Sequence, residues 1–401
     1  MTRRKGTLTP WLENASSGAF SAYAIVAAFG AYFCMYAFRK PFAAGTYEGL
    51  QFAGTAVDLK TAFVVSQIMG YTLSKYIGIR VCSEATRDGR ARLLIQLILA
   101  AEAALLLFAV LPPQWKVVAI FLNGLPLGMV WGLVVAYLEG RRTSELLLAG
   151  LSCSFIVASG MVKDVGRWLM RDHGVAESWM PFATGLLFIV PFLVMVYLLT
   201  QLPDPTREDE ELRMHREPMD GAHRVSFLRK FGVPLAVLFV AYFFLTAYRD
   251  FRDNYGIEVF TALGYGEEPG VFTQTETWVA FGVLVPLALL FMVRNNRLAL
   301  ALTYALMLSG CALLVLSTFL LDRGLISGLT WMVLVGLGSY MAYVPYGSVL
   351  FDRMIAATRV TGTAVFAIYV ADALGYTGSV VVQLYKDLGQ AELSRLEFFQ
   401  G

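Results

Sequence analysis

Apolar residues in this chain gather into runs of roughly 20 residues, which is the length an α-helix needs to cross the hydrocarbon core of a bilayer. Shorter polar stretches separate these runs. The pattern predicts about eleven membrane-spanning helices, so we expect an all-α polytopic membrane protein. The expected spans cover residues 20–46, 59–80, 92–111, 115–139, 144–166, 179–202, 231–251, 274–293, 297–321, 327–351 and 360–386.

The longest polar stretch, residues 203–230, divides the expected spans into two groups. We therefore expect an N-terminal six-helix half at 1–202, a cytoplasmic linker at 203–230 and a C-terminal half at 231–401 with five visible spans. An even partition requires a twelfth helix after the final "LSRLEFFQG", so we expect the natural protein to continue there. The alternative is an eleven-span protein whose C-terminus lies outside.

Composition and charge agree with a membrane protein and suggest its orientation. The chain is 57% hydrophobic and 15% charged, with a mean hydropathy of +0.60, whereas soluble domains are about 25% charged. With the N-terminus inside, the inner segments hold 20 of the 32 Lys and Arg residues, so we expect a cytoplasmic N-terminus and a plasma (inner) membrane location. The net charge of +2 gives no reason to expect a nucleic-acid partner.

Cysteine and histidine residues give no sign of metal, cofactor or catalytic chemistry. The four cysteines are far apart without a CxxC spacing, and the three histidines fall in polar loops. The chain contains neither an HExxH nor a GxSxG motif, so we expect no cofactor, no metal and no enzymatic activity.

Two ten-residue stretches are nearly alike: "AYFCMYAFRK" at 31–40 and "AYFFLTAYRD" at 241–250. Each belongs to the first expected span of its half, and each carries an arginine, Arg39 or Arg249, near apolar residues. Transporters are often built from two related halves that hold substrate near the membrane midplane. We expect both arginines to line one central cavity. The alternative is that each lies near a helix end and extends its charge to the interface.

Further polar groups lie within the expected spans. Tyr32, Tyr36 and Arg39 are spaced by four and three residues, which places them on one face of a helix. Tyr71 and Lys75 share a face in the same way, although the lysine could instead extend to the interface. The carboxylates Glu102 and Asp372 lie in apolar runs, where each is either a proton carrier for coupling or a structural partner for a cation.

The chain resembles the major facilitator superfamily, and within it the organophosphate:phosphate antiporters, which transport glycerol 3-phosphate and hexose phosphates. The first helix of that family carries Tyr-x3-Tyr-x2-Arg-Lys, the second Tyr-x3-Lys-aromatic, the seventh a second substrate arginine, the tenth Tyr-x-Pro, and the eleventh a GTA segment leading to a tyrosine between glycines. The matching residues in this chain are Tyr32, Tyr36, Arg39 and Lys40; Tyr71, Lys75 and Tyr76; Arg249; Tyr343 and Pro345; and Tyr376 in "GTAVFAIYVADALGYTGS".

The resemblance implies two six-helix halves around a central cavity, in which two arginines clamp a phosphate group. Guanidinium groups bind phosphate through paired hydrogen bonds, which suits this role. The family has a substrate-contacting histidine in its fifth helix, and this chain has none in any expected span. Substrate-binding candidates are therefore Tyr32, Tyr36, Arg39, Lys40, Tyr71, Lys75, Arg249, Tyr343 and Tyr376, and coupling candidates are Glu102 and Asp372.

We expect a secondary active transporter, an antiporter of a small organic anion that is phosphorylated or carboxylated. Its expected partners are this solute and the lipid bilayer, and we expect a monomer. The alternative is a membrane sensor of the same fold, which binds ligand without moving it and passes a signal to another protein. Ligand binding without exchange across a membrane would distinguish the sensor from the transporter.

Overall fold

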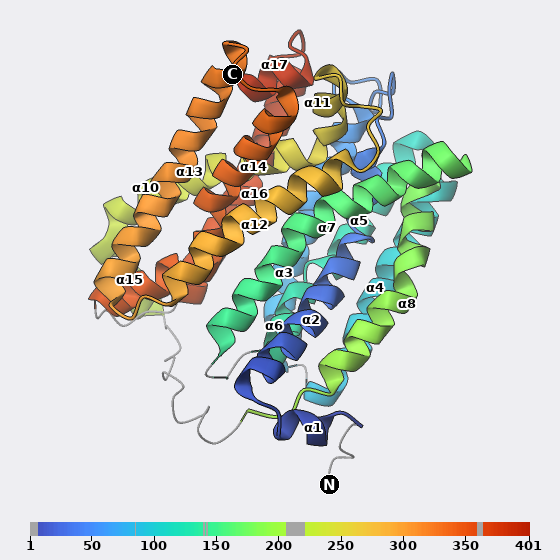
Figure 1. Ribbon diagram of the computed structural model, residues 1–401. Helices are drawn as coiled ribbons and strands as arrows, with labels where there is room; N and C mark the ends of the chain where they lie inside the picture. The colour runs from blue at the N-terminus through green and yellow to red at the C-terminus, as the bar shows by residue number, and fades with distance from the viewer. Residues whose placement is uncertain (1–6, 85, 139–140, 142, 206–220, 359–363) are drawn as a thin grey trace. The chain divides into compact units, whose positions relative to one another are not determined.

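The structure is a computed structural model that describes residues 7–84, 86–138, 141, 143–205, 221–358 and 364–401. Within these residues the chain is helical, apart from connecting segments and one isolated bridge between Gln51 and Asp58. The chain forms two compact units, Met1–Arg213 and Met214–Gly401 (Figure 1). The expected all-α membrane fold is confirmed, while most of the expected linker falls at 206–220, outside the described residues.

The first unit is a bundle of helices, which follow one another along the chain as α1 (Thr9–Glu13), α2 (Ser17–Tyr36), η1 (Pro41–Ala44), α3 (Leu59–Glu84), α4 (Arg87–Val110), η2 (Pro113–Trp115), α5 (Lys116–Leu127), α6 (Val130–Leu138), α7 (Ser144–His173) and α8 (Met180–Thr200). Helix α5 packs against both α3 and α4, and α8 closes on α4. Helix α2 packs against α7 and α8 (Figure 1).

The second unit is also a helix bundle, with these elements: α10 (Gly221–Asn254), α11 (Gly256–Ala262), α12 (Val271–Phe291), α13 (Asn296–Asp322), α14 (Gly328–Ser348), α15 (Leu350–Thr358), α16 (Ala364–Gly389) and α17 (Arg395–Gln400). Helix α14 packs against α12 and α13, while α10 runs along α16. The short helix α17 packs against α10 and α11.

A helix lies at each of the expected spans. In the described part of the chain, nine helical segments are long and apolar enough to cross a membrane. Helices α3 and α16 are not among these nine, although each is 26 residues long. Both carry charged residues inside the span, Lys75 in α3 and Asp372 in α16, and such residues lower the mean hydropathy of a segment.

Some expected boundaries are wrong, and prolines account for two of the differences. The span expected at 20–46 ends as a regular helix at Tyr36, shortly before Pro41. The span expected at 115–139 is divided between α5 and α6 just after Pro126, which has no N–H to donate to the carbonyl four residues earlier. The span expected at 231–251 belongs to the longer helix α10, which begins at Gly221.

Helices α3 and α5 approach each other backbone to backbone. A Cβ atom added at Gly124 of α5 would lie only 2.5 Å from the backbone oxygen of Gln67 in α3. A side chain at this position would therefore push the helices apart, so glycine permits the close contact. The approach brings the neighbouring side chain of Asn123 within hydrogen-bonding distance of Gln67, 2.9 Å from Nε2 to Oδ1.

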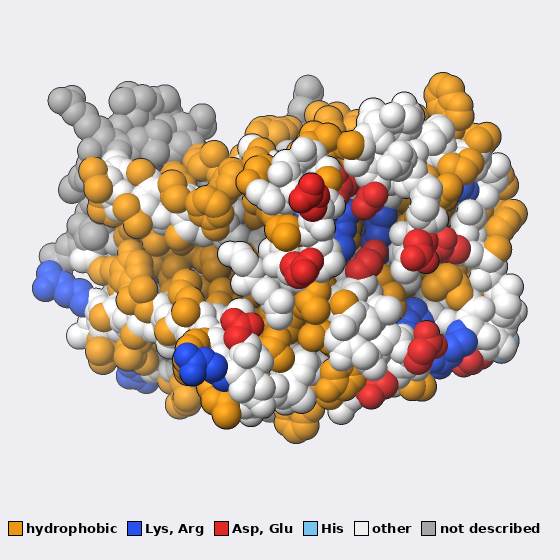
Figure 2. All heavy atoms as spheres, turned by 90° about the horizontal axis from the view of Figure 1, so that it is seen from above, with side chains coloured by type: hydrophobic (Ala, Val, Ile, Leu, Met, Phe, Trp, Pro, Cys, Tyr) orange, Lys and Arg blue, Asp and Glu red, His pale blue; other side chains and the backbone are white. Residues whose placement is uncertain are grey.

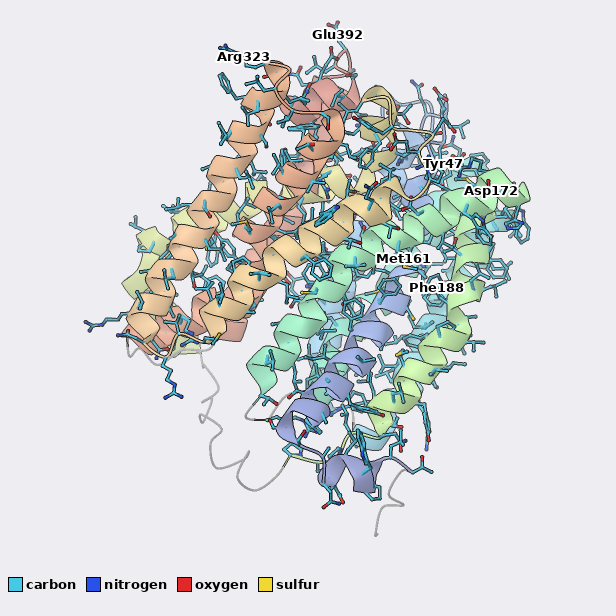
Figure 3. The ribbon with its side chains drawn as sticks, viewed as in Figure 1. Tyr47, Met161, Asp172, Phe188, Arg323 and Glu392 are labelled. Atoms are coloured by element: carbon cyan, nitrogen blue, oxygen red, sulfur yellow. The ribbon has the colours of Figure 1, made fainter. Side chains whose placement is uncertain are left out.

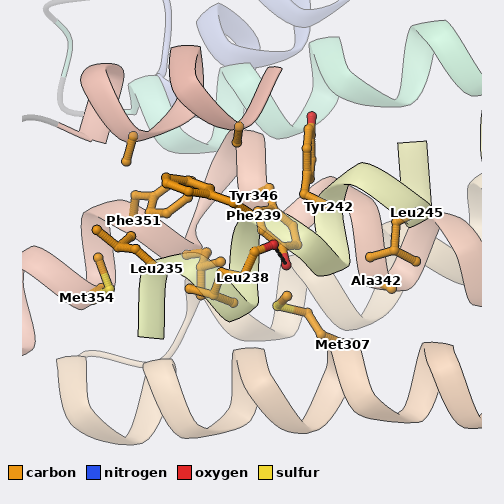
Figure 4. Packing of buried hydrophobic residues seen from close by; sticks show 13 residues of the cluster. Leu235, Leu238, Phe239, Tyr242, Leu245, Met307, Ala342, Tyr346, Phe351 and Met354 are labelled. Atoms are coloured by element: carbon orange, nitrogen blue, oxygen red, sulfur yellow. Dashed lines mark hydrogen bonds between the residues drawn. The ribbon is translucent and has the colours of Figure 1, made fainter. Parts of the chain in front are cut away.

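The second unit has two clusters of buried apolar side chains. The first joins α10, α13, α14, α15 and α16, and its Tyr346 hydroxyl donates a hydrogen bond of 2.9 Å to the Leu238 carbonyl (Figure 4). The second lies around α11 and α17 and includes Phe251, Trp331 and Phe399. The first cluster therefore joins the middle of α10 to later helices, and the second joins its end to α11 and to helices further along the chain.

The outer surface is rich in apolar side chains, as lipid-facing helices require. Orange hydrophobic side chains cover much of the visible surface in the space-filling view (Figure 2). Val233, Met292 and Val315 are each more than 70% exposed. Charged side chains such as Asp172 in the first unit and Glu392 in the second lie at helix ends or in loops (Figure 3).

Candidate functional site

The chain breaks out of helix directly after α2, at the turn that carries Arg39. The backbone amides of Arg39 and Lys40 both donate to the Tyr36 carbonyl, at 3.0 and 2.9 Å, and the Arg39 bond, to the residue three before it, is that of a tighter turn. Pro41 then opens η1; it has no N–H, and its ring would clash with a preceding helical carbonyl. Arg39 therefore lies in a buried turn, 8% exposed, rather than within a continuous span.

Two buried amides support this turn. Asn123 Nδ2 donates to the Phe38 carbonyl at 2.9 Å, and Gln67 Nε2 donates to the Arg39 carbonyl at 2.9 Å. The two side chains also bond to each other. Non-helical backbone at membrane depth is stable only when its polar groups find partners within the protein, and these amides supply them. Neither residue was among the predicted site residues, although an amide inside an apolar run was the signal that could have identified them.

The Arg39 guanidinium lies against a cluster of aromatic rings. Its Cζ is 4.0 Å from the centre of the Tyr71 ring and 5.7 Å from that of Tyr36. Tyr32 packs edge-on against Tyr36, at 5.7 Å between ring centres, and against Trp131 at 4.8 Å. A cation over an aromatic face is stabilised by the ring's electron density, which partly offsets its loss of hydration. The structure thus brings the expected tyrosines of two helices to Arg39.

A second cation shares the Tyr71 ring. Lys75 Nζ lies 5.6 Å from the centre of that ring, so Tyr71 has two positive charges near its ring. Lys40, next to Arg39 in the turn, is 4% exposed. Positive charge is therefore concentrated in this part of the first unit. The role of these residues in binding a substrate stays a prediction.

In the second unit, Arg249 has a similar aromatic neighbour but a different charge environment. Its Cζ is 4.1 Å from the centre of the Tyr343 ring. Its Nη2 also lies 2.5 Å from Oδ1 of the adjacent Asp250. The other Asp250 oxygen accepts a hydrogen bond of 2.7 Å from Ser379. Arg249 is therefore within α10, mostly buried, and its charge is balanced by a fixed carboxylate.

The expected tyrosines of α14 and α16 lie near Arg249 or near Asp372. Tyr242 of α10 stacks on Tyr343 with 5.1 Å between ring centres, and its hydroxyl donates to Asp372 Oδ1 at 2.9 Å. Tyr376 is also buried, at 8% exposure. Asp372 is therefore part of a hydrogen-bonded aromatic cluster, whereas the sequence left open whether it has a structural partner.

Arg252 forms a buried ion pair that the sequence analysis missed. Its Nη1 lies 2.6 Å from Glu276 Oε1, and its Nη2 donates to the Met332 carbonyl at 2.9 Å. Both charged side chains are at most 6% exposed. The pair links α10, α12 and α14, and we interpret it as a structural connection because the two opposite charges are paired.

Glu102, the other coupling candidate, has surroundings unlike those of Asp372. It lies in α4 with 5% exposure, and neither carboxylate oxygen has a hydrogen-bond partner among the described residues. No group of three or more His, Cys, Asp or Glu side chains suitable for a metal ion is found within the ranges that the structure describes.

Several solved membrane transporters share this fold. A D-xylose–proton symporter has a TM-score of 0.61 at 16% sequence identity, covering 92% of this chain and 90% of that chain. A mutant of the nucleoside transporter NupG has a TM-score of 0.61 at 11% identity, covering 95% and 94%. A peptide transporter in complex with sulfate has a TM-score of 0.57 at 13% identity, covering 95% and 91%. The chain therefore has the major facilitator superfamily fold.

Sequence comparisons are less informative about function. No curated protein matches the chain. The profile of one family, described as a family of unknown function (DUF5690), matches residues 41–401. The narrower resemblance to organophosphate:phosphate antiporters stays a prediction.

Proposed function

We propose that this chain, which belongs to the family of unknown function DUF5690, is a secondary active transporter of a small anionic solute. It would move the solute across the membrane by alternating access, as an antiporter, and phosphorylated solutes are the first class to test. The observation that carries the proposal is the buried guanidinium of Arg39, held against Tyr71 in a supported helix break. Similarity to the fold of known transporters gives further support.

An anion is the solute class that fits this charge. Arg39 presents N–H groups in a planar fork that matches the oxygen atoms of phosphate or carboxylate. Tyrosine hydroxyls nearby can donate further hydrogen bonds to such oxygens. Lys75, at the same Tyr71 ring, adds to the attraction.

Arg249 has a carboxylate beside it. Arg249 faces Asp250 at 2.5 Å, and that carboxylate is held in place by Ser379. An incoming anion would have to compete with a carboxylate that is already present. We propose Arg39, whose guanidinium lies against Tyr71 and Tyr36 in the supported turn, as the principal anion-binding residue, and Arg249 as a secondary one.

Exchange across liposomes tests this proposal. The purified protein should exchange labelled phosphate, sugar phosphates or carboxylates, and Arg39→Ala should lower the rate at least roughly tenfold, because a charge-assisted hydrogen bond contributes about 1.5–3 kcal/mol. Arg249→Ala should lower it less. Arg323→Ala is the control, because this exposed arginine lies in the turn after α13.

Two outcomes would contradict the proposal. Exchange of an anion that is equally fast in Arg39→Ala would remove Arg39 from the site. Ligand binding that raises the thermal stability of the protein without any exchange would favour the sensor over the transporter.

A further inference from the structure

The carboxyl group of Glu102 is buried in the wall of the first unit rather than in the arginine–tyrosine cluster. Helix α8 closes over it at Gly185, where an added Cβ atom would overlap the Glu102 carboxyl group. The absence of a side chain at Gly185 lets the α8 backbone come directly against the carboxyl. The 5% exposure of Glu102 results from this contact.

The elements packed against α4 bring no cation to Glu102. Helices α6 and α8 contain no charged residue, and the only charged residue in α5 is Lys116. The Lys116 ammonium donates to the carbonyls of Phe108 and Ala109, near the far end of α4 from its start. Neither oxygen of Glu102 accepts a hydrogen bond from any residue that the structure describes.

Two other titratable groups on these elements, Arg90 and Tyr197, have their own contacts. Arg90, early in α4, donates to the Ala136 carbonyl at 2.8 Å and lies over the Tyr137 ring of α6. Tyr197, late in α8, is hydrogen-bonded to Thr7 at 2.8 Å. Arg90 precedes Glu102 by more than three helical turns, and Tyr197 follows Gly185 by a similar distance along α8. Glu102 is therefore without a charged neighbour among the described side chains of these helices.

We propose that Glu102 is a proton-binding site of the first unit. An ionised carboxylate buried without a cation or a hydrogen-bond donor is strongly unfavourable, so the group takes up a proton instead. In the packed arrangement of α4 and α8, Glu102 is a neutral acid. When the two helices separate and water enters, its O–H bond can break and the proton passes to water. Proton uptake and release then accompany movement of α8 against α4.

The site is connected to the turn that carries Arg39. Asn123 donates to the carbonyl of Ala101, the residue before Glu102, at 3.1 Å, and to the carbonyl of Phe38, the residue before Arg39, at 2.9 Å. A shift of α4 at Glu102 would disturb one of these bonds. If the proposed transport function holds, this connection offers a route by which proton release changes the position of Arg39.

Labelling with a hydrophobic carbodiimide tests the proton site without any substrate. Such reagents react with protonated carboxyl groups in apolar surroundings, and mass spectrometry locates the adduct. Glu276 is the matched control, because it is equally buried but bonded to Arg252. We expect an adduct at Glu102 that is at least roughly tenfold more abundant than at Glu276, a ratio equivalent to about 1.4 kcal/mol, and that decreases as pH rises. Equal labelling of both residues, or no adduct at Glu102, would overturn the proposal.

A second measurement uses the variant Glu102→Gln, which keeps the shape of the neutral acid. If transport occurs, the variant should retain stabilisation by inorganic phosphate but lose the pH dependence of exchange. An exchange rate with the wild-type pH dependence in the variant would contradict coupling through Glu102. Failure of anion transport leaves the labelling result intact, so the two proposals are tested separately.

Discussion

Arg39 and Arg249 place their guanidinium groups at nearly the same distance from a tyrosine ring, 4.0 and 4.1 Å, yet their environments differ. Arg249 has an adjacent carboxylate at 2.5 Å. The backbone carbonyl of Arg39 accepts a hydrogen bond from Gln67, and its guanidinium shares the Tyr71 ring with the ammonium of Lys75. The duplicated sequence therefore produces two related contacts but not two equivalent sites. The residue after Arg249 is Asp250, which pairs with it, whereas the residue after Arg39 is the lysine Lys40.

Replacement of Asn123 by alanine should destabilise the first unit. Loss of the amide leaves the carbonyls of Phe38 and Ala101 without this donor, at a cost of about 1–3 kcal/mol for a buried polar group. Thermal unfolding in detergent should show a lower midpoint. Leu122→Ala is the control, because Leu122 is on the same helix but 41% exposed. Equal effects of the two substitutions would show that the amide bonds contribute nothing specific.

Glu276→Gln should be strongly destabilising, because it leaves the buried Arg252 without its counter-charge. Removing one partner of a buried ion pair costs about 3–5 kcal/mol. Asp172→Asn breaks the exposed Arg171–Asp172 pair, whose side chains are 40% and 45% exposed, and should change stability by only about 0–1 kcal/mol. Denaturation of both variants and of the wild type measures the loss in unfolding free energy that each substitution causes. Similar losses in the two variants would contradict a stabilising role of the buried Arg252–Glu276 pair.

At the scale of elements, the last helix is defined by tertiary contacts. Helix α17 has six residues, too few to be stable alone, and a capping box between Ser394 and Glu397 opens it. Hydrogen bonds from Ser394 lower the pKa of Glu397. The ionised Glu397 therefore stabilises the start of α17 fully above the ordinary pKa of a glutamate. This stabilisation is lost as the pH falls through the lowered pKa of Glu397. Arg395 also pairs with Asp387 at 2.7 Å.

Phe399→Ala should detach α17 from the second unit. The Phe399 ring stacks on Tyr248 with 4.5 Å between ring centres and packs against Trp331 at 5.5 Å. Truncating a buried phenylalanine costs about 3–5 kcal/mol. Phe398→Ala should cost less, since that side chain is only half-buried. Proteolysis after Arg395 would become faster in Phe399→Ala; unchanged cleavage would mean that α17 is held by other contacts.

At the scale of the whole molecule, the distribution of basic residues makes an orientation testable. In a chain whose four cysteines are replaced, a single cysteine at Thr55, in the loop before α3, should react with a membrane-impermeant reagent added outside cells. A cysteine at Asn295, in the turn before α13, should react only after the membrane is opened. The reverse pattern would place the N-terminus outside.

The sequence by itself determined roughly where the long helices are, because an apolar run of about 20 residues is a local property of the chain. It also predicted that Tyr32 and Tyr36 share one face of the first span, and both lie in α2, whereas Arg39 lies in the turn after that helix. Boundaries at prolines were less predictable, as at Pro41, because the chain can bend or resume its helix there.

Only the tertiary structure decided which polar groups have partners. Gln67 and Asn123 meet because α3 and α5 approach at Gly124, and no sequence spacing encodes that contact. The same holds for the two carboxylates in apolar runs. Asp372 receives a hydrogen bond from Tyr242, whereas Glu102 is enclosed by the backbone of α8 at Gly185. Their local sequences look alike, but the charge that each can carry depends on neighbours from other helices.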